Sequence, residues 1–263
     1  MFCIVPLGAL GFLSIPGKYR IRGNADLLDQ QLALRCVALY FSEVTLFGES
    51  AGAASVGFHL LSPGSSGLFR RAVLQSASPT APWASISHAE AWNRSLTLAS
   101  LPGCPLSSAA DLELCLQMAD PEDIVTLQHQ VFTQASLLAI PFLPLVHDNF
   151  LPDDPEVGIP SLEEKHSSIY STTAPPPTPV WMGVMHGYEI EFVFGVPLDA
   201  SLKYTQREVN MSRTIMKHWA NFARTGNPSL SGAPWPLFEA ESQVYVTLST
   251  DPPQPKSKMI AQR

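Results

Sequence analysis

The chain has 263 residues, of which 46% are hydrophobic, and its formal net charge at pH 7 is −7. This length and apolar content are enough to bury a sizeable core, and they predict a single domain. The 16 Lys and Arg residues are scattered along the chain, which argues against nucleic-acid binding. No apolar run is long enough to span a bilayer as a helix. The apolar run 1–13 lacks the basic flank and cleavage site of a signal peptide.

The amino-terminal half alternates short strand-like and helix-like runs. The predicted elements are a buried strand from Phe2 to Phe12, a helix from Leu27 to Arg35, a strand from Val44 to Phe47, a helix from Ala53 to Leu61 and a strand from Ala72 to Ser76. Asn24 or Asp26 can cap the first helix, which carries apolar residues on one face. Strand, helix and strand in such close succession predict a parallel α/β sheet.

The run Gly48-Glu49-Ser50-Ala51-Gly52 joins the second strand to the helix that follows it. A G-x-S-x-G sequence between a strand and a helix is typical of a nucleophile elbow, a tight and strained turn that projects a serine hydroxyl. We expect glycine at both ends because side chains there would collide with neighbouring backbone. The N–H of Ala51, at the start of the helix, can then face a developing oxyanion.

The carboxyl-terminal third predicts one long amphipathic helix from Arg207 to Arg224, closed by Gly226. A strand from Val244 to Leu248 follows, and then a Pro-rich tail. The Ser- and Pro-rich stretch between residues 158 and 180 has the composition of a flexible linker.

Several long motifs resemble the carboxylesterase type B family, and within it the cholinesterases. They are Gly23-Asn24 with the run 27–34, the run 44–55 around Ser50, the run 59–63, Trp181 to Phe192, and Trp219 to Pro228. The resemblance implies an α/β-hydrolase fold, here partial, with a mostly parallel sheet flanked by helices. It implies hydrolysis of choline esters through an acyl-serine intermediate in a deep, aromatic-lined gorge.

By resemblance, Ser50 is the nucleophile and His186 is the general base. An imidazole suits this task, because it must take the proton of Ser50 and later hand it to the leaving alcohol. The chain order also agrees with α/β-hydrolases, in which the histidine comes last. His147 and His166 also follow the serine, but only His186 lies in the family motif.

The resemblance also assigns substrate-binding residues. Glu49 would lie near the cationic head of the substrate and steady the histidinium, whereas Trp181 and Tyr188 would face the quaternary ammonium with their rings. The acyl pocket would be formed by Trp83, Leu138 and Ile140. Acetyl-selective members carry aromatic residues at the last two positions, so the aliphatic side chains here predict a wider, butyryl-tolerant pocket. Ordinary core packing is the alternative for Trp181 and Tyr188.

Other family features have no counterpart here. The Gly-rich oxyanion segment and the main choline-binding aromatic residue belong upstream of residue 1. The catalytic Glu belongs between 157 and 180, where Glu163 and Glu164 lie without the family motif, so neither is assigned. We therefore expect one incomplete carboxylesterase type B domain over 1–263, with 157–180 a shortened, linker-like region. We expect this chain to be poorly active, and the alternative function is a non-catalytic cholinesterase-like adhesion protein or incomplete product.

Cys104 and Cys115 match a family disulfide pair, and Asn93 and Asn210 begin glycosylation sequons. The resemblance implies a secreted or cell-surface protein of the extracellular space. It implies a small-molecule choline ester as partner and no cofactor or metal. It allows a homo-oligomer, with membrane attachment only through segments outside this sequence.

Overall fold

The computed structural model describes residues 5–17, 19–131, 140–158, 169–171, 185–232, 234–239, 241–242, 244–251 and 254–256. The chain divides into two compact units, unit 1 from Met1 to Ser161 and unit 2 from Leu162 to Arg263. Each unit has a hydrophobic core of its own. The prediction of a single incomplete domain over 1–263 remains a prediction. Among the described residues, no helix combines the length and the apolar content needed to cross a membrane.

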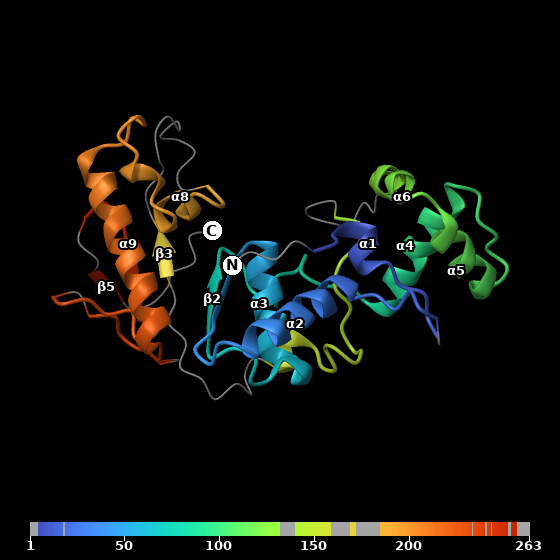
Figure 1. Ribbon diagram of the computed structural model, residues 1–263, viewed down its shortest axis with the longest axis horizontal. Coiled ribbons are helices and arrows are strands. Elements are labelled where there is room, and N and C mark those ends of the chain that lie inside the picture. The colour runs from blue at the N-terminus through green and yellow to red at the C-terminus, as the bar shows by residue number, and fades with distance from the viewer. Residues whose placement is uncertain are drawn as a thin grey trace. The chain divides into compact units, whose positions relative to one another are not determined.

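Unit 1 contains a parallel pair of strands with a helix packed against both of them (Figure 1). β1 (Thr45–Glu49) pairs with β2 (Arg71–Gln75), so that Gly48 lies opposite Leu74. α3 (Ala51–Leu61) follows β1 after one residue, and η1 (Pro63–Ser65) leads back towards β2. A crossover helix between parallel strands is the arrangement that the sequence predicts for this region.

α2 (Ala25–Ala38) confirms the predicted first helix but not its cap. Asn24 stands at the N-cap position with φ 52°, and its side chain makes no capping bond. Instead its Oδ1 accepts from the N–H of Leu145 at 2.7 Å, and its Nδ2 donates to the carbonyl of Leu145 at 2.9 Å. Asn24 therefore joins the start of α2 to a segment 121 residues away.

The expected strand from Phe2 to Phe12 is wrong where the chain is described. Gly8–Phe12 form a short helix, α1, whose Ala9 N–H donates to Oε1 of Gln128 at 2.8 Å. A short apolar run without alternation fits a buried helix as well as a buried strand, and here the partners decide. A Cβ on Gly11 would stand 2.4 Å from the carbonyl oxygen of Pro6. The segment just before α1 can therefore pack this closely against the helix only because residue 11 is a glycine.

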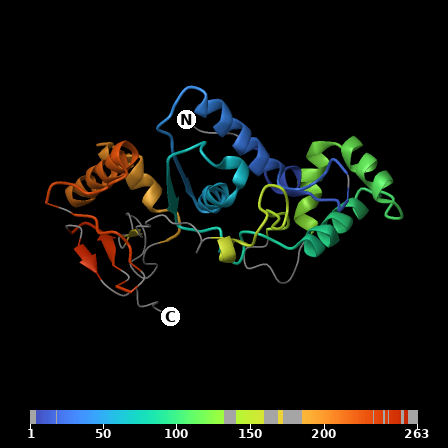
Figure 2. The same ribbon diagram turned by 90° about the horizontal axis from the view of Figure 1, so that it is seen from below.

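A group of helices, green in Figure 2, lies apart from the strand pair within unit 1. It comprises α4 (His88–Ser100), α5 (Ala109–Met118), α6 (Pro121–Leu127) and η2 (Gln128–Gln130), whereas the short α7 (Pro155–Gly158) contacts α3. Ser87, Ser108 and Asp120 cap the first three of these helices by accepting backbone N–H bonds. Their buried side chains, Leu98 and Leu112 among them, join Phe58 of α3 in one core.

Unit 2 is built around α9 (Gln206–Thr225), which confirms the predicted long helix. A capping box between Thr205 and Glu208 opens it, and Gly226 closes it in the left-handed conformation. β4 (Tyr245–Leu248) pairs in parallel with β3 (Ile169–Ser171) and antiparallel with β5 (Gln254–Lys256). Short strands thus occur at 169–171, within the stretch predicted as a linker, and at 254–256, within the Pro-rich tail, and the linker-like character of 157–180 stays a prediction.

The turn between α2 and β1 is unusually apolar at its surface. Leu39, Tyr40 and Phe41 are 79%, 81% and 66% exposed, and Leu28 and Leu32 of α2 are also exposed. α2 therefore does not bury all of the apolar face that the sequence predicts. Contiguous exposed apolar side chains of this kind mark a surface prone to association.

A chain of buried polar side chains ties α2 to α3. Gln30 donates to Asp26 Oδ2 at 3.0 Å and its Oε1 lies 3.2 Å from His59 Nε2. His59 Nδ1 lies 2.8 Å from Ser65 Oγ, which also accepts from Gln31 at 3.0 Å. Gln30 can only accept through Oε1, so His59 carries its proton on Nε2 and Ser65 donates to Nδ1. His59 is thus a packed residue of the interior with both ring nitrogens bonded.

Burial shifts the pKa values of the two titratable residues in this hydrogen-bonded series, His59 and Asp26, in opposite directions. Burial lowers the pKa of His59 from 6.5 to about 4. Its neutral form stabilises the fold fully above pH 6.5, and this contribution is lost as the pH falls towards 4. Burial raises the pKa of Asp26 from 3.8 to about 6, although the bond from Gln30 lowers it. The Asp26 carboxylate therefore destabilises the fold above this pKa, and the cost disappears as the pH falls towards 3.8.

We expect Asp26→Asn to raise the free energy of unfolding by on the order of 2 kcal/mol at about pH 7.5, with no gain at about pH 3.5. The substitution removes the buried charge while keeping an oxygen that accepts from Gln30. Urea titrations across this pH range measure the effect, with the exposed neighbour Asp29 as the matched control, Asp29→Asn. A gain independent of pH, or an equal gain in the control, contradicts the account.

Candidate active site

Ser50 occupies the single residue between β1 and α3 and has the backbone conformation of a nucleophile elbow. Its φ is 56° and its ψ is −121°, a region that residues with a side chain rarely adopt. Two bonds hold it there, from its N–H to the carbonyl of Gln75 at 2.9 Å and from the N–H of Ala54 to its carbonyl at 3.1 Å. The neighbouring strand and the first helical turn therefore impose the strain.

Glycine is required at one end of the elbow and not at the other. A Cβ on Gly48 would stand 2.4 Å from both the carbonyl carbon and oxygen of Gly52, so the turn can close only over a hydrogen atom. A Cβ on Gly52 would meet nothing within 4 Å. The expectation that both glycines avoid a backbone collision is thus correct for Gly48 and wrong for Gly52, because the close approach concerns only the backbone of Gly52.

The elbow places the Ser50 side chain at the amino end of α3. Ala51 is the first helical residue, and N–H groups in a first turn have no partner within the helix. These N–H groups and the helix dipole stabilise negative charge, which is what an attacked ester carbonyl develops. Ser50 is half-buried and Ala51 is exposed, so the position is open to a reactant.

A second serine, Ser76, provides an internal comparison. It follows β2, the strand beside β1, and also has a positive φ, of 62°. Ser76 is exposed and no helix begins after it. It therefore lacks the helix amino terminus that distinguishes Ser50.

The other predicted residues of unit 1 lie in three places. Glu49, the last residue of β1, is half-buried and lies opposite Gln75. Trp83 is half-buried and packs against the core, and its role in the acyl pocket stays a prediction. Ile140 is half-buried, and its carbonyl accepts from Arg94 at 3.1 Å. Leu138 lies outside the described residues.

In unit 2, His186 begins a turn that leads into α8 (Glu189–Val193). Its side chain is exposed, and Gly187 supplies the positive φ of 85° that the turn needs. Tyr188 is half-buried, and its N–H donates to the carbonyl of Met185 at 3.3 Å. Trp181 lies outside the described residues.

α8 is fixed to α9 and to the segment before it, which gives the His186 turn a firm support. Ser212 donates to the carbonyl of Phe192 at 2.8 Å, and the hydroxyl of Tyr204 donates to Glu191. Burial and the carboxylate of Glu191 raise the pKa of Tyr204 to about 12, so the phenol keeps its proton.

Ser50 belongs to unit 1 and His186 to unit 2. Their pairing as nucleophile and base stays a prediction, as do the roles of Ala51, Glu49 and Tyr188. Glu163 and Glu164 lie outside the described residues, and the acid of the triad stays unassigned.

The sequence predicts one disulfide and two glycosylation sites. Cys104 and Cys115 form a disulfide with their Cα atoms 5.8 Å apart, which confirms the pair. Asn93 on α4 and Asn210 on α9 are both exposed. Modification of either asparagine stays a prediction.

A cavity of about 350 Å³ lies along α9 in unit 2. Its lining includes three cationic side chains, Arg213, Lys217 and Arg224. None of the residues predicted for catalysis lines it, so the cavity has no part in the candidate active site.

The strand–elbow–helix of unit 1 defines a protein of the α/β-hydrolase class. A family model described as the carboxylesterase family matches residues 6–174 and 160–263, which together include most of the chain. The chain belongs to the carboxylesterase family. Its fold class is therefore the predicted one, a partial α/β-hydrolase with parallel strands flanked by helices.

Two relatives show which members it resembles. It is 32% identical to an acetylcholinesterase of Bungarus fasciatus over 371 residues, and 33% identical to a cholinesterase of Mus musculus over 369 residues. Each comparison includes 97% of this chain and 61% of the relative, so the chain spans about three fifths of the length of these curated relatives. Because the comparisons run over more positions than the chain has residues, the relatives contain segments inside the match that have no counterpart here.

The two glycines of the elbow give a matched pair of substitutions. Gly48→Ala should destabilise unit 1 by about 1–3 kcal/mol, because its Cβ meets backbone that cannot rotate away. Gly52→Ala, in the first turn of α3, should change stability by no more than about 1 kcal/mol and towards greater stability. Urea unfolding of both variants measures this. Equal destabilisation by the two would contradict the geometry of the turn.

Proposed function

We propose that the chain is a serine ester hydrolase that acts on choline esters through an acyl-serine intermediate. One observation carries the proposal, the strained backbone of Ser50 at the start of α3. Such strain persists only where surrounding structure imposes it, and it is concentrated at functional positions. Membership of the carboxylesterase family supports ester hydrolysis, and the printed names of the two relatives support choline esters.

In this mechanism Ser50 attacks the ester carbonyl while His186 takes its proton. The developing oxyanion receives the N–H of Ala51 at the amino end of α3. His186 then protonates the leaving alcohol, and water releases the acid in a second, equivalent step. No cofactor is needed, because the serine and the imidazole supply both the nucleophile and the proton transfers.

Substrate recognition would use an acidic and aromatic side for choline and an aliphatic side for the acyl group. Glu49 is the last residue of β1 and directly precedes Ser50, so its carboxylate would lie close to the nucleophile. Trp181 and Tyr188 would contribute aromatic faces to a quaternary ammonium. Trp83, Leu138 and Ile140 would form the acyl pocket, wide enough for a butyryl group.

We further propose that the protein works in the extracellular space. The disulfide between Cys104 and Cys115 supports an oxidising compartment, since such bonds are rare where thiols are kept reduced. The exposed Asn93 and Asn210 are both positioned on the surface of their units, as glycan attachment requires.

A fluorophosphonate probe that reacts with activated serines tests the proposal. The folded chain should be labelled at Ser50, Ser50→Ala should lose labelling completely, and His186→Ala should slow it by roughly 10²–10⁴-fold. Mass spectrometry of the labelled peptides locates the adduct.

Ser76→Ala is the matched control, because Ser76 shares the positive φ and follows the neighbouring strand. It should label as fast as the parent chain. A folded chain that takes up no probe would reject the esterase and favour the second candidate, a non-catalytic cholinesterase-like protein.

A further inference from the structure

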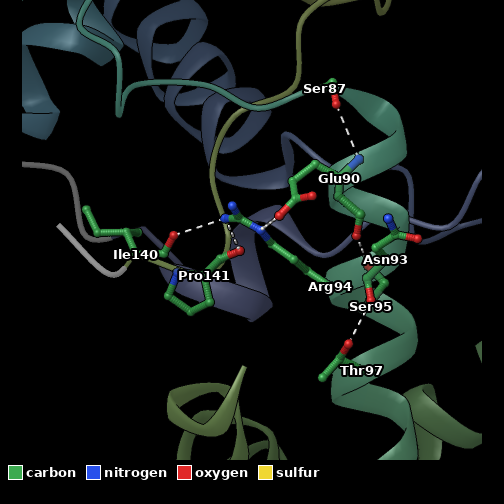
Figure 3. A network of polar contacts seen from close by, with 9 residues as sticks. Ser87, Glu90, Asn93, Arg94, Ser95, Thr97, Ile140 and Pro141 are labelled. Atoms are coloured by element: carbon green, nitrogen blue, oxygen red, sulfur yellow. Dashed lines mark hydrogen bonds and ion pairs between the residues drawn. The ribbon is translucent and has the colours of Figure 1, made fainter. Parts of the chain in front are cut away.

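The segment that begins at Ile140 is held by one buried arginine of α4 (Figure 3). Nη1 of Arg94 donates to the carbonyl of Ile140 at 3.1 Å and to that of Pro141 at 2.9 Å. Its Nε donates to Oε1 of Glu90, one turn earlier, at 2.7 Å. Only 7% of the Arg94 side chain is exposed, whereas that of Glu90 is 39% exposed.

The other anchors of this segment lie farther along it. The carbonyl of Pro144 accepts from the N–H of Ile86 at 3.0 Å, and Leu145 is bonded at both backbone groups to Asn24. Pro141 itself has no N–H to donate. Among the described residues, Arg94 therefore makes the polar contacts nearest to the Ile140 side chain.

The same helix also follows the loop that contains Trp83. Ser87 caps α4, and Ile86, just before it, forms a parallel bridge with Leu145. Of the two described members of the predicted acyl pocket, Trp83 thus precedes the amino end of α4 and Ile140 is bonded to the middle of the same helix.

We propose that Arg94 is a positioning residue for acyl selectivity: by fixing the carbonyls of Ile140 and Pro141 to α4, it sets the distance between Ile140 and Trp83 and so the width of the acyl pocket. This inference rests on the proposed function. It adds a residue that touches no substrate and acts through the backbone of the pocket wall.

The chemistry of the contact explains why an arginine is needed. A guanidinium is planar and presents several N–H groups in a fixed fork, so it can donate to two successive carbonyls and a carboxylate together. A lysine ammonium carries the same charge without that fork. Glu90 supplies the countercharge that a buried cation requires.

The test uses Arg94→Lys and Arg94→Met, both of which keep the Asn93–Ser95 sequon and so leave glycosylation unchanged. Two phosphonate probes, one with a methyl and one with a propyl group at phosphorus, stand in for acetyl and butyryl. The ratio of their labelling rate constants at Ser50 measures acyl selectivity. We expect both variants to change this ratio by about 10-fold, a change of the size that one or two methylene groups produce in an apolar pocket.

Arg35→Met is the matched control. Arg35 of α2 also donates to a main-chain carbonyl of another segment of unit 1, that of Gly64 in η1, at 3.1 Å, and to Oε1 of Gln31 at 3.2 Å. It should leave the ratio unchanged. Hydrogen exchange at Phe142 and Leu143 supplies a second readout, and it should rise in the Arg94 variants alone.

The outcomes separate the inference from the proposed function. An unchanged ratio in folded Arg94→Lys, or an equal change in Arg35→Met, overturns the positioning role while leaving the esterase intact. A folded parent chain that reacts with neither probe overturns the proposed function and this inference with it. If Arg94→Met does not fold, Arg94→Lys decides.

Discussion

The turn over Gly48 is the constraint on which the candidate active site depends. β1 ends and α3 begins within one residue, and the backbone of Gly52 fills the space that any side chain at position 48 would need. Closing that turn forces Ser50 to a positive φ, and the bond to Gln75 ties it to the neighbouring strand. Because the backbone of Ser50 is fixed before a substrate binds, orienting the nucleophile adds less to the activation free energy.

The rest of unit 1 supports that turn from two sides. The polar chain from Asp26 to Ser65 joins α2 to the far end of α3, and the apolar core joins α3 to the helical group. α4 then provides a frame for the segments around Trp83 and Ile140 through the Ile86 bridge and the Arg94 guanidinium. Catalysis and selectivity would thus depend on different supports, which is why substitutions can separate them.

The sequence predicts those parts of the fold that depend on neighbouring residues. β1, α3, β2 and α9 were all expected, because period, glycine spacing and caps are local signals. α1 was missed because an apolar run without alternation has no preferred structure until Gln128 bonds to it. The role of Asn24 was missed because its partner, Leu145, is 121 residues away. The bonds from Arg94 to Ile140 and Pro141 are indicated in the sequence only weakly, by a Glu one turn before an Arg. On most helices such a pair is exposed.

The central claim is that the Ser50 hydroxyl and the His186 imidazole form one proton-transfer pair. NMR spectra of the histidine rings, recorded before and after phosphonylation of Ser50, measure this directly, with His186→Gln used to assign the His186 signal among the seven histidines. The phosphonyl oxygens of the adduct would accept a hydrogen bond from the paired imidazole, so the account predicts that the ring signals of His186 shift while those of the buried His59 and His218 stay unchanged. Ring signals of His186 that are the same in both forms would contradict the pairing.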